Sequence, residues 1–181
     1  MKRNRSHAGR VVLEDGVFMI EDWLPYEFSF VANRVSSTLS EMYGQRYGFS
    51  VTGWRVVAAL GTHPNISAKE LAELIGMDQV SITRAVGKLS GSGMVLRRGD
   101  TGDRRRVNLQ LSAKGKAAYE DVLPLAQRIE EVLVESLSEA QKKSLKGTMK
   151  LMVARATRFL SDEKDWIGLL AVPKHSRTRK G

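Results

Sequence analysis

The chain contains no cysteine. This absence excludes disulfide bonds, zinc sites built on thiolates and cysteine-based redox sensing. No apolar run reaches the roughly 18 residues that a transmembrane helix needs, so no membrane span is expected. The first residues are basic, but no apolar core follows them as in a secretory signal peptide. We therefore expect a cytoplasmic protein that has no membrane partner.

Motifs of enzymes are also missing. The three histidines, His7, His63 and His175, lie far apart in the sequence. We find no glycine-rich phosphate loop, no His/Asp/Glu spacing typical of a metal site and no nucleophile elbow. We therefore expect a protein that is not an enzyme and that needs neither a cofactor nor a metal.

Positive charge is in excess. The chain has 29 basic and 20 acidic residues, a formal net charge of +9. Such an excess attracts polyanions, most commonly nucleic acid, although an anionic membrane surface or a merely solvated surface would also fit. A chain of 181 residues that is 42% hydrophobic can bury a core without covalent staples, in one domain with appended arms.

Most of the chain has helical periodicity. Apolar residues recur at steps of three and four from Leu24 to Met42, which predicts an amphipathic helix ending near Gly44 or Gly48. A second helix is expected from about Val51 to just before Pro64.

Two short helices are predicted in the middle of the chain. Ser67 and Glu70 have the spacing of a capping box at the start of the first helix. Gly76 ends that helix, and Asp78 is a good N-cap for the next one, expected over Gln79–Ser90.

A β-hairpin follows. Met94–Leu96 predicts a short strand, Arg97–Arg106 a charged loop, and Val107–Leu111 a second strand with alternating polar and apolar residues. Helices after it are expected to begin at the Ser112 cap and at a second capping box at Ser138. We place a bend at Pro124 of the first of these helices.

Two helices joined by a glycine turn and followed by a basic hairpin form a winged helix-turn-helix. An α-helix fits the major groove of B-DNA, where base edges are distinguishable, and the preceding helix braces it across the backbone. On a helical wheel, the outer side of the second helix carries two cations and no acidic residue, whereas an ordinary solvated face mixes both signs. The residues of this outer side are Val80, Thr83, Arg84, Gly87, Lys88 and Gly91. Its two glycines each cost about 1 kcal/mol in a helix but let the backbone approach DNA closely.

Several segments together match a known pattern. They are Leu71-Ala72-Glu73-Leu74-Ile75-Gly76, Ser81-Ile82-Thr83-Arg84, Leu89, Gly93-Met94-Val95, Asp100-Thr101-Gly102-Asp103-Arg104-Arg105 and Leu109-Gln110-Leu111-Ser112-Ala113-Lys114-Gly115. The chain thereby resembles the MarR family of bacterial winged helix-turn-helix transcriptional regulators over roughly residues 24–160. Gly87 and Gly91 depart from the family, which usually has a longer polar residue at the first of these positions.

The resemblance implies a mainly α fold with a small β-hairpin wing and an α-helical dimerisation layer. It divides the chain into a basic arm (1–22), a winged-helix domain (23–161) and a C-terminal extension (162–181). Within the domain, residues of about 23–44 and 113–161 would dimerise, and those of about 51–111 would bind DNA. The implied homodimer would pair one apolar stripe with another and bind a palindromic operator whose half-sites lie about 10 bp apart. The two stripes are Leu24, Phe28, Val31 and Val35, and Leu145, Met149, Met152 and Phe159.

The expected contacts to double-stranded DNA lie on the second helix of the pair and on the wing. The resemblance implies that Arg84 and its neighbours enter the major groove and that Arg104 serves the wing. The full set is Gln79, Val80, Ser81, Thr83, Arg84, Lys88, Arg98, Arg104 and Arg105.

The resemblance also implies a pocket for a small ligand, often an aromatic acid, between the dimer layer and the winged helix. Arginine beside aromatic rings suits an anionic aromatic molecule, which would release a repressor from DNA. The candidate residues are Tyr26, Phe30, Arg34, Trp54, Arg55 and His63. Alternatively, these are core or surface residues, and the protein is a winged helix without a ligand switch, constitutive or binding RNA or protein. Trp166–Val172 before a basic end would also fit an interfacial membrane anchor.

Overall fold

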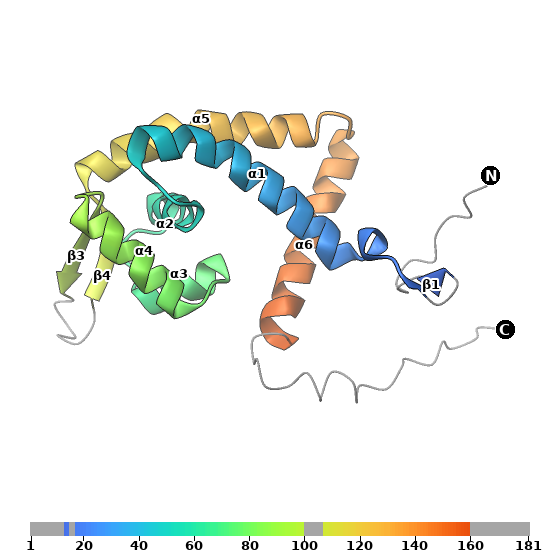
Figure 1. Ribbon diagram of the computed structural model, residues 1–181, viewed down its shortest axis with the longest axis horizontal. Coiled ribbons are helices and arrows are strands. Elements are labelled where there is room, and N and C mark those ends of the chain that lie inside the picture. The colour runs from blue at the N-terminus through green and yellow to red at the C-terminus, as the bar shows by residue number, and fades with distance from the viewer. Residues whose placement is uncertain (1–12, 15–16, 100–106, 160–181) are drawn as a thin grey trace. The chain divides into compact units, whose positions relative to one another are not determined.

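The computed structural model describes residues 13–14, 17–99 and 107–159 (Figure 1). The expected wing contacts Arg104 and Arg105, and the C-terminal extension, lie outside these residues. The chain divides into two compact units, Met1–Glu130 and Glu131–Gly181, and each is considered by itself.

Helices dominate both units. Among its described residues the first unit contains a small strand pair, a 3₁₀ helix, four complete α-helices, most of α5 and a hairpin, and the second contains the end of α5 and all of α6. In chain order the elements are β1 (Leu13–Glu14), β2 (Val17–Phe18), the 3₁₀ helix η1 (Ile20–Asp22), α1 (Leu24–Tyr47), α2 (Val51–Thr62), α3 (Ala68–Ile75), α4 (Gln79–Gly91), β3 (Val95–Gly99), β4 (Val107–Leu111), α5 (Ala113–Leu133) and α6 (Glu139–Phe159).

Helix α1 is one turn longer than its first glycine suggests. It continues through Gly44 and ends at Tyr47, because Gly48 adopts φ +68° and donates its N–H to the Gly44 carbonyl at 2.9 Å. Helix α2 then starts at Ser50, whose hydroxyl accepts from the Gly53 N–H at 3.0 Å. Gly48 was one of the two predicted ends of α1, whereas the Ser50 cap of α2 was not predicted.

The helix-turn-helix forms as predicted. The Glu70 N–H donates to the Ser67 hydroxyl at 3.2 Å, and the Ser67 N–H donates to the Glu70 carboxylate at 2.7 Å. Gly76 closes α3 with φ +69°, a left-handed conformation that favours glycine. Asp78 caps α4, its carboxylate accepting from the Ser81 N–H at 2.8 Å.

The hairpin differs from the prediction at one strand. β3 runs through Arg97 and Arg98 to Gly99, so these residues are part of the ladder rather than of a loop. β3 and β4 pair antiparallel, with Arg97 opposite Leu109 and Arg98 opposite Asn108. The prediction was wrong here because a charged side chain can lie in a strand when its aliphatic stem covers apolar neighbours.

The two later caps are confirmed. The Ser112 hydroxyl accepts from the Gly115 N–H at 3.0 Å, and the Ser138 hydroxyl accepts from the Gln141 N–H at 3.3 Å. Helix α5 continues through Pro124. The antiparallel pair β1–β2 and the η1 turn, in the segment expected to be a basic arm, were not predicted.

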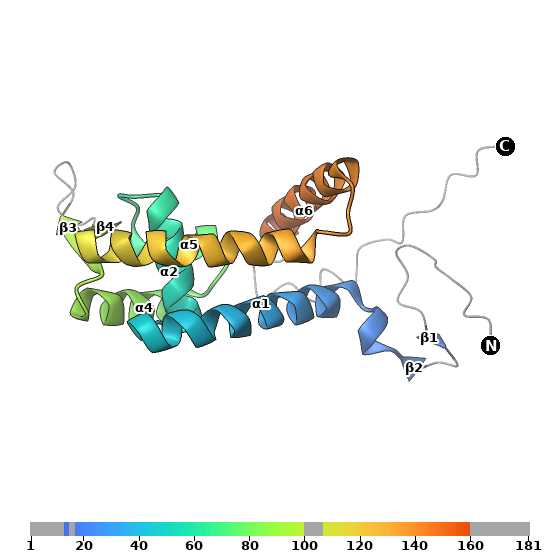
Figure 2. The ribbon, with the colours of Figure 1, turned by 90° about the horizontal axis from the view of Figure 1, so that it is seen from above.

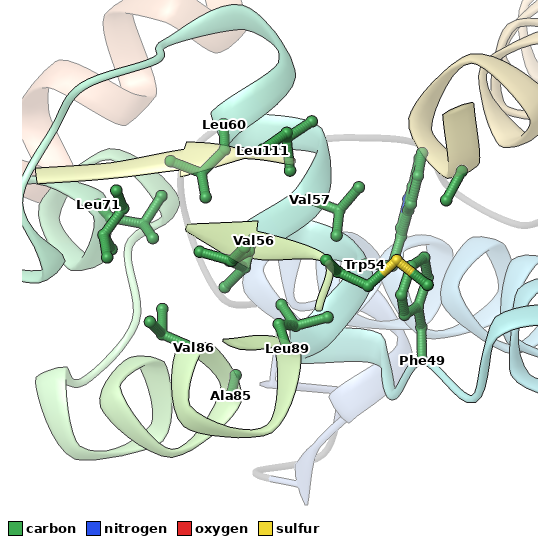
Figure 3. Close-up of a cluster of buried hydrophobic side chains, with 14 of the residues drawn as sticks. Phe49, Trp54, Val56, Val57, Leu60, Leu71, Ala85, Val86, Leu89 and Leu111 are labelled. Carbon is green, nitrogen blue, oxygen red and sulfur yellow. The ribbon is translucent and has the colours of Figure 1, made fainter. Parts of the chain in front are cut away.

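The core is built around α2. Figure 3 shows Val56, Val57 and Leu60 of α2 between α4 and the hairpin, with Leu71 of α3 beside them. A fully buried aliphatic side chain of this kind contributes about 1.5–3 kcal/mol, so the core fixes α3, α4 and the hairpin around α2.

Helix α1 is joined to α5 as well as to α2. The C-terminal part of α1 lies beside α5 (Figure 1 and Figure 2). The Tyr47 hydroxyl donates to the Asp121 carboxylate at 2.7 Å, and Arg46 Nε lies 3.2 Å from the same carboxylate oxygen. The Asp121 hydrogen bond, together with burial, raises the pKa of Tyr47. The C-terminal end of α1 is therefore anchored in the first unit.

Candidate nucleic-acid interface

The inner side of α4 packs in the hydrophobic core. Ile82, Ala85, Val86 and Leu89 are buried, with Ile82 at 0% exposure. Their spacing of three and four leaves the opposite side of the helix to solvent, and this burial fixes which residues face outward.

The outer side of α4 is exposed throughout, as predicted. Val80 is 69% exposed, and Thr83, Arg84 and Lys88 are exposed as well. Gln79, Val80, Thr83 and Arg84 line an open surface hollow. This helix face thus combines hydrogen-bonding groups, the apolar Val80 side chain and two cations. Such groups suit contacts to base edges and phosphates in a major groove.

The start of α4 is held by its own cap. Ser81 is half-buried and hydrogen-bonds to Asp78, and these bonds lower the pKa of the Asp78 carboxyl. The carboxylate therefore stays ionised, bound to the first turn of α4, where the helix dipole also favours a negative charge. Ser81 has less freedom to contact DNA than the other expected residues of this helix.

The described part of the wing adds two arginines from adjacent positions of β3. Arg98 lies on the same face of the hairpin as Gln110, and its guanidinium donates to the Gln110 side-chain oxygen. Arg97 points to the other face, where its Nη2 lies 4.0 Å from the position that a Cβ atom on Gly87 would take.

The expected ligand residues fall in three places. Trp54 is 7% exposed and is stacked between Tyr43 and Tyr119, with ring centroids 5.7 and 6.4 Å away. The neighbouring Arg55 donates to the Met77 sulfur at 3.9 Å.

The other candidates are exposed. On the N-terminal half of α1, the Arg34 guanidinium lies 5.5 Å from the Phe30 ring centroid, and Tyr26 lies one turn away. His63 is exposed at the end of α2, where its Nδ1 lies 2.9 Å from the Thr62 hydroxyl.

Tyr43 was not among the predicted residues. Its ring is completely buried, and its hydroxyl has no hydrogen-bond partner among the described residues. Burial raises the pKa of Tyr43, and the charge of Arg55 opposes that shift. Tyr43 continues the apolar stripe one step beyond Met42, where the sequence analysis stopped.

Neither a metal site nor a membrane span emerges from the described ranges. No group of three or more His, Cys, Asp or Glu side chains in them is placed to hold a metal ion. No helix in this part of the chain is long and apolar enough to cross a membrane.

Three elements together define a winged helix-turn-helix DNA-binding protein. They are α4 with its buried inner side and cationic outer side, the capped helix α3 that braces it, and the β3–β4 hairpin. Comparison with known proteins narrows this class. The sequence profile of the MarR family matches residues 49–107, which contain α2, α3, α4 and β3.

Relatives and solved structures agree with that match. The HTH-type transcriptional regulator BilQ of Clostridium symbiosum is 32% identical over 101 residues, 56% of this chain and 70% of BilQ. The HTH-type transcriptional repressor NicR of Pseudomonas putida is 29% identical over 97 residues, 54% of this chain and 61% of NicR. A putative MarR family regulator from Listeria monocytogenes, solved with a 26mer DNA, has a TM-score of 0.73 at 14% identity, covering 86% of this chain and 99% of that one. The chain belongs to the MarR family of transcriptional regulators.

Proposed function

We propose that the protein regulates transcription by binding double-stranded DNA as a homodimer. The observation that carries this proposal is the outer side of α4, which exposes Thr83, Arg84 and Lys88 while Ile82 and Val86 fix the inner side in the core. A rigid cationic helix face of this kind suits the major groove.

The DNA contacts follow from this placement. Gln79, Val80, Thr83 and Arg84 would face base edges, and Lys88 would contact a phosphate; Ser81 would contribute from the capped first turn. Arg98, Arg104 and Arg105 would contact the backbone or a narrow minor groove from the wing. The Listeria protein of the same fold, solved with DNA, supports this arrangement.

The homodimer would use the dimerisation helices of about 23–44 and 113–161, and it would bind a palindromic operator. Exposed apolar residues support the pairing: Leu24 and Val31 are each 47% exposed on α1, and Leu145 is 44% exposed on α6. Two-fold symmetry of the protein would require half-sites about 10 bp apart. A footprint confined to one asymmetric half-site would contradict this part of the proposal.

The regulator would be a repressor that a small aromatic acid releases. NicR, a relative, is a repressor, and the Tyr43 hydroxyl, which has no hydrogen-bond partner among the described residues, supports the proposal as an unused donor in the neighbourhood of Trp54. Trp54, which is already stacked against Tyr43 and Tyr119, would form part of the pocket wall, and Tyr26, Phe30, Arg34 and His63 would line the approach.

Selection of duplexes from a random library, followed by gel shift, tests the proposal. We expect enrichment of a palindrome, binding in the nanomolar range at physiological salt, and weaker binding when benzoate is added. Benzoate with no effect would leave a regulator without this ligand switch. Preference for single-stranded RNA over every duplex would favour the RNA-binding alternative.

Val80 would read a thymine methyl, since it is 69% exposed on an otherwise polar face and the core cannot reach it. Replacing each operator thymine by uracil deletes only the methyl group. At least one position should weaken binding of the wild-type protein and be silent in Val80→Ala.

A further inference from the structure

The two arginines of β3 point to opposite faces of the hairpin. Arg97 is paired with Leu109, two residues along from the Val95–Leu111 pair. Directly paired residues of an antiparallel ladder share a face, and alternate residues of a strand do as well. Val95, Leu109 and Leu111 are 2%, 2% and 5% exposed, so Arg97 lies on the face of the hairpin that packs against the helices.

Gly87 lies where the Arg97 side chain leaves that face. A Cβ atom on Gly87 would lie 4.0 Å from Arg97 Nη2, and it would have no nearer neighbour outside the helix itself. The guanidinium therefore lies close to the space that a side chain on Gly87 would fill. A longer side chain at this position would compete with it for the same space.

Arg97 thereby joins the cations of α4. Arg84 and Lys88 are three residues before and one residue after Gly87, and both are exposed on the same outer side of the helix. A guanidinium beside Gly87 adds a third positive charge to this side, one that the helix sequence does not contain.

We propose that Arg97 binds a phosphate at the edge of the major groove and works as part of the α4 surface, and that the lack of a long side chain at Gly87 leaves room for it. The first turn of a recognition helix lies closest to the bases, and Gly87 is two turns further on, where the helix side approaches the backbone. Planar guanidinium suits two parallel hydrogen bonds to phosphate oxygens. This inference rests on the proposed DNA binding.

Salt-dependent binding to a generic duplex of about 30 bp tests the role of Arg97, because phosphate contacts need no particular sequence. We expect Arg97→Ala to weaken binding about 5- to 30-fold per dimer. We also expect it to reduce the slope of log K against log salt by about 0.9 for each lost contact. Relative to Arg97→Ala, Arg97→Lys should restore the slope, since it keeps the charge, but only part of the affinity, since it lacks the bidentate geometry. Unchanged affinity and slope in Arg97→Ala would overturn the proposal.

A double-mutant comparison with Gly87 distinguishes the DNA-binding role of Arg97 from that of any other surface cation. Gly87→Leu should displace the guanidinium and weaken binding, and adding Arg97→Ala to it should then cost little more. Arg98→Ala is the matched control, because it removes the same charge one residue along on the opposite face; its effect should be the same with or without Gly87→Leu. Gly87→Ala, whose Cβ makes only an ordinary contact, should leave the effect of Arg97→Ala unchanged.

If Gly87→Leu left the binding loss caused by Arg97→Ala as large as before, as is expected for Arg98→Ala, then Arg97 would not act through the α4 surface. Circular dichroism and thermal melts of each variant verify folding. If the wild-type protein bound no duplex, the proposed function would fail. If it bound, and Arg84→Ala weakened binding while Arg97→Ala did not, this inference alone would fail.

Discussion

Two exposed surfaces of the first unit differ in chemistry. The outer side of α4 presents Arg84 and Lys88 with polar neighbours. The N-terminal half of α1 presents Leu24, Tyr26, Phe30 and Val31, of which Phe30 is 50% exposed. A charged surface is stable in water, but an apolar surface of this kind favours a protein partner. The difference is what the proposed function requires, with α4 binding DNA and α1 binding a second copy of the chain.

The two halves of α1 sharpen this comparison. In the C-terminal half Leu39 and Tyr43 are 6% and 0% exposed, because they pack on the winged-helix core. The N-terminal half carries a similar apolar stripe that the first unit does not cover. One helix thus belongs to two layers, a buried one within the chain and an exposed one suited to a dimer.

The largest expected effect comes from charging the exposed half of α1. Leu24→Glu combined with Val31→Glu should give a monomer and weaken operator binding by about 100-fold or more, because the second half-site no longer binds as part of the same molecule. Light scattering and gel shift measure the two effects. Asn33→Glu with Ser37→Glu adds the same charge to the opposite side of the helix and should leave the dimer intact. A monomeric wild-type protein at micromolar concentration would contradict the role of α1.

Neighbouring residues of α4 should separate stability from binding. Ile82→Ala removes a fully buried side chain and should lower the free energy of unfolding by about 2–5 kcal/mol. Thr83→Ala, one residue along on the exposed side, should change it by less than about 0.5 kcal/mol while weakening DNA binding. Urea denaturation at one fixed protein concentration measures the free energy of unfolding of the two variants, and gel shift measures their DNA binding. Similar destabilisation in the two variants would mean that the two sides of α4 are not distinct.

A smaller effect is expected at the start of α3, which braces α4. Ser67→Ala removes the hydroxyl that accepts from the Glu70 N–H at 3.2 Å, and it should cost about 1 kcal/mol. Thermal unfolding measures the loss. Lys69→Ala, at an exposed position in the same turn, is the control and should be nearly neutral. A neutral Ser67→Ala would show that packing alone holds α3.

The smallest expected effect is the pH dependence of stability that the Asp78 cap gives in acid. Hydrogen bonds to Ser81 lower the pKa of Asp78 below its ordinary value of 3.8, so the ionised cap stabilises the folded state above pH 3.8. This contribution is lost as the pH falls through the lowered pKa. Asp78→Asn keeps a capping oxygen without a titrating proton, so its unfolding free energy should vary less over that acidic range. Parallel pH profiles for the wild-type protein and the variant would contradict the assigned cause.

The elements that the sequence predicted best are those with local signals. The caps at Ser67, Asp78 and Ser138 each depend on residues within three positions, and all three form. The division of α4 into a buried and an exposed side followed from its period alone.

What the sequence did not predict depends on contacts between distant residues. The length of β3 is set by pairing with β4, and the place of Arg97 beside Gly87 requires the hairpin to pack on α4. The burial of Tyr43 depends on stacking against Trp54 of the next helix. No local pattern contains these contacts, although the position of Tyr43 four residues after Leu39 does place it on the apolar side of α1.

The central claim is tested most directly by equilibrium binding. The wild-type protein and Arg84→Ala are each titrated against a labelled duplex and against its two separated strands. If the exposed side of α4 reads a major groove, the duplex binds more tightly than either strand, and Arg84→Ala costs about 1–3 kcal/mol on the selected duplex. Equal binding to single strands, or an Arg84→Ala variant as tight as the wild-type protein, would contradict the account.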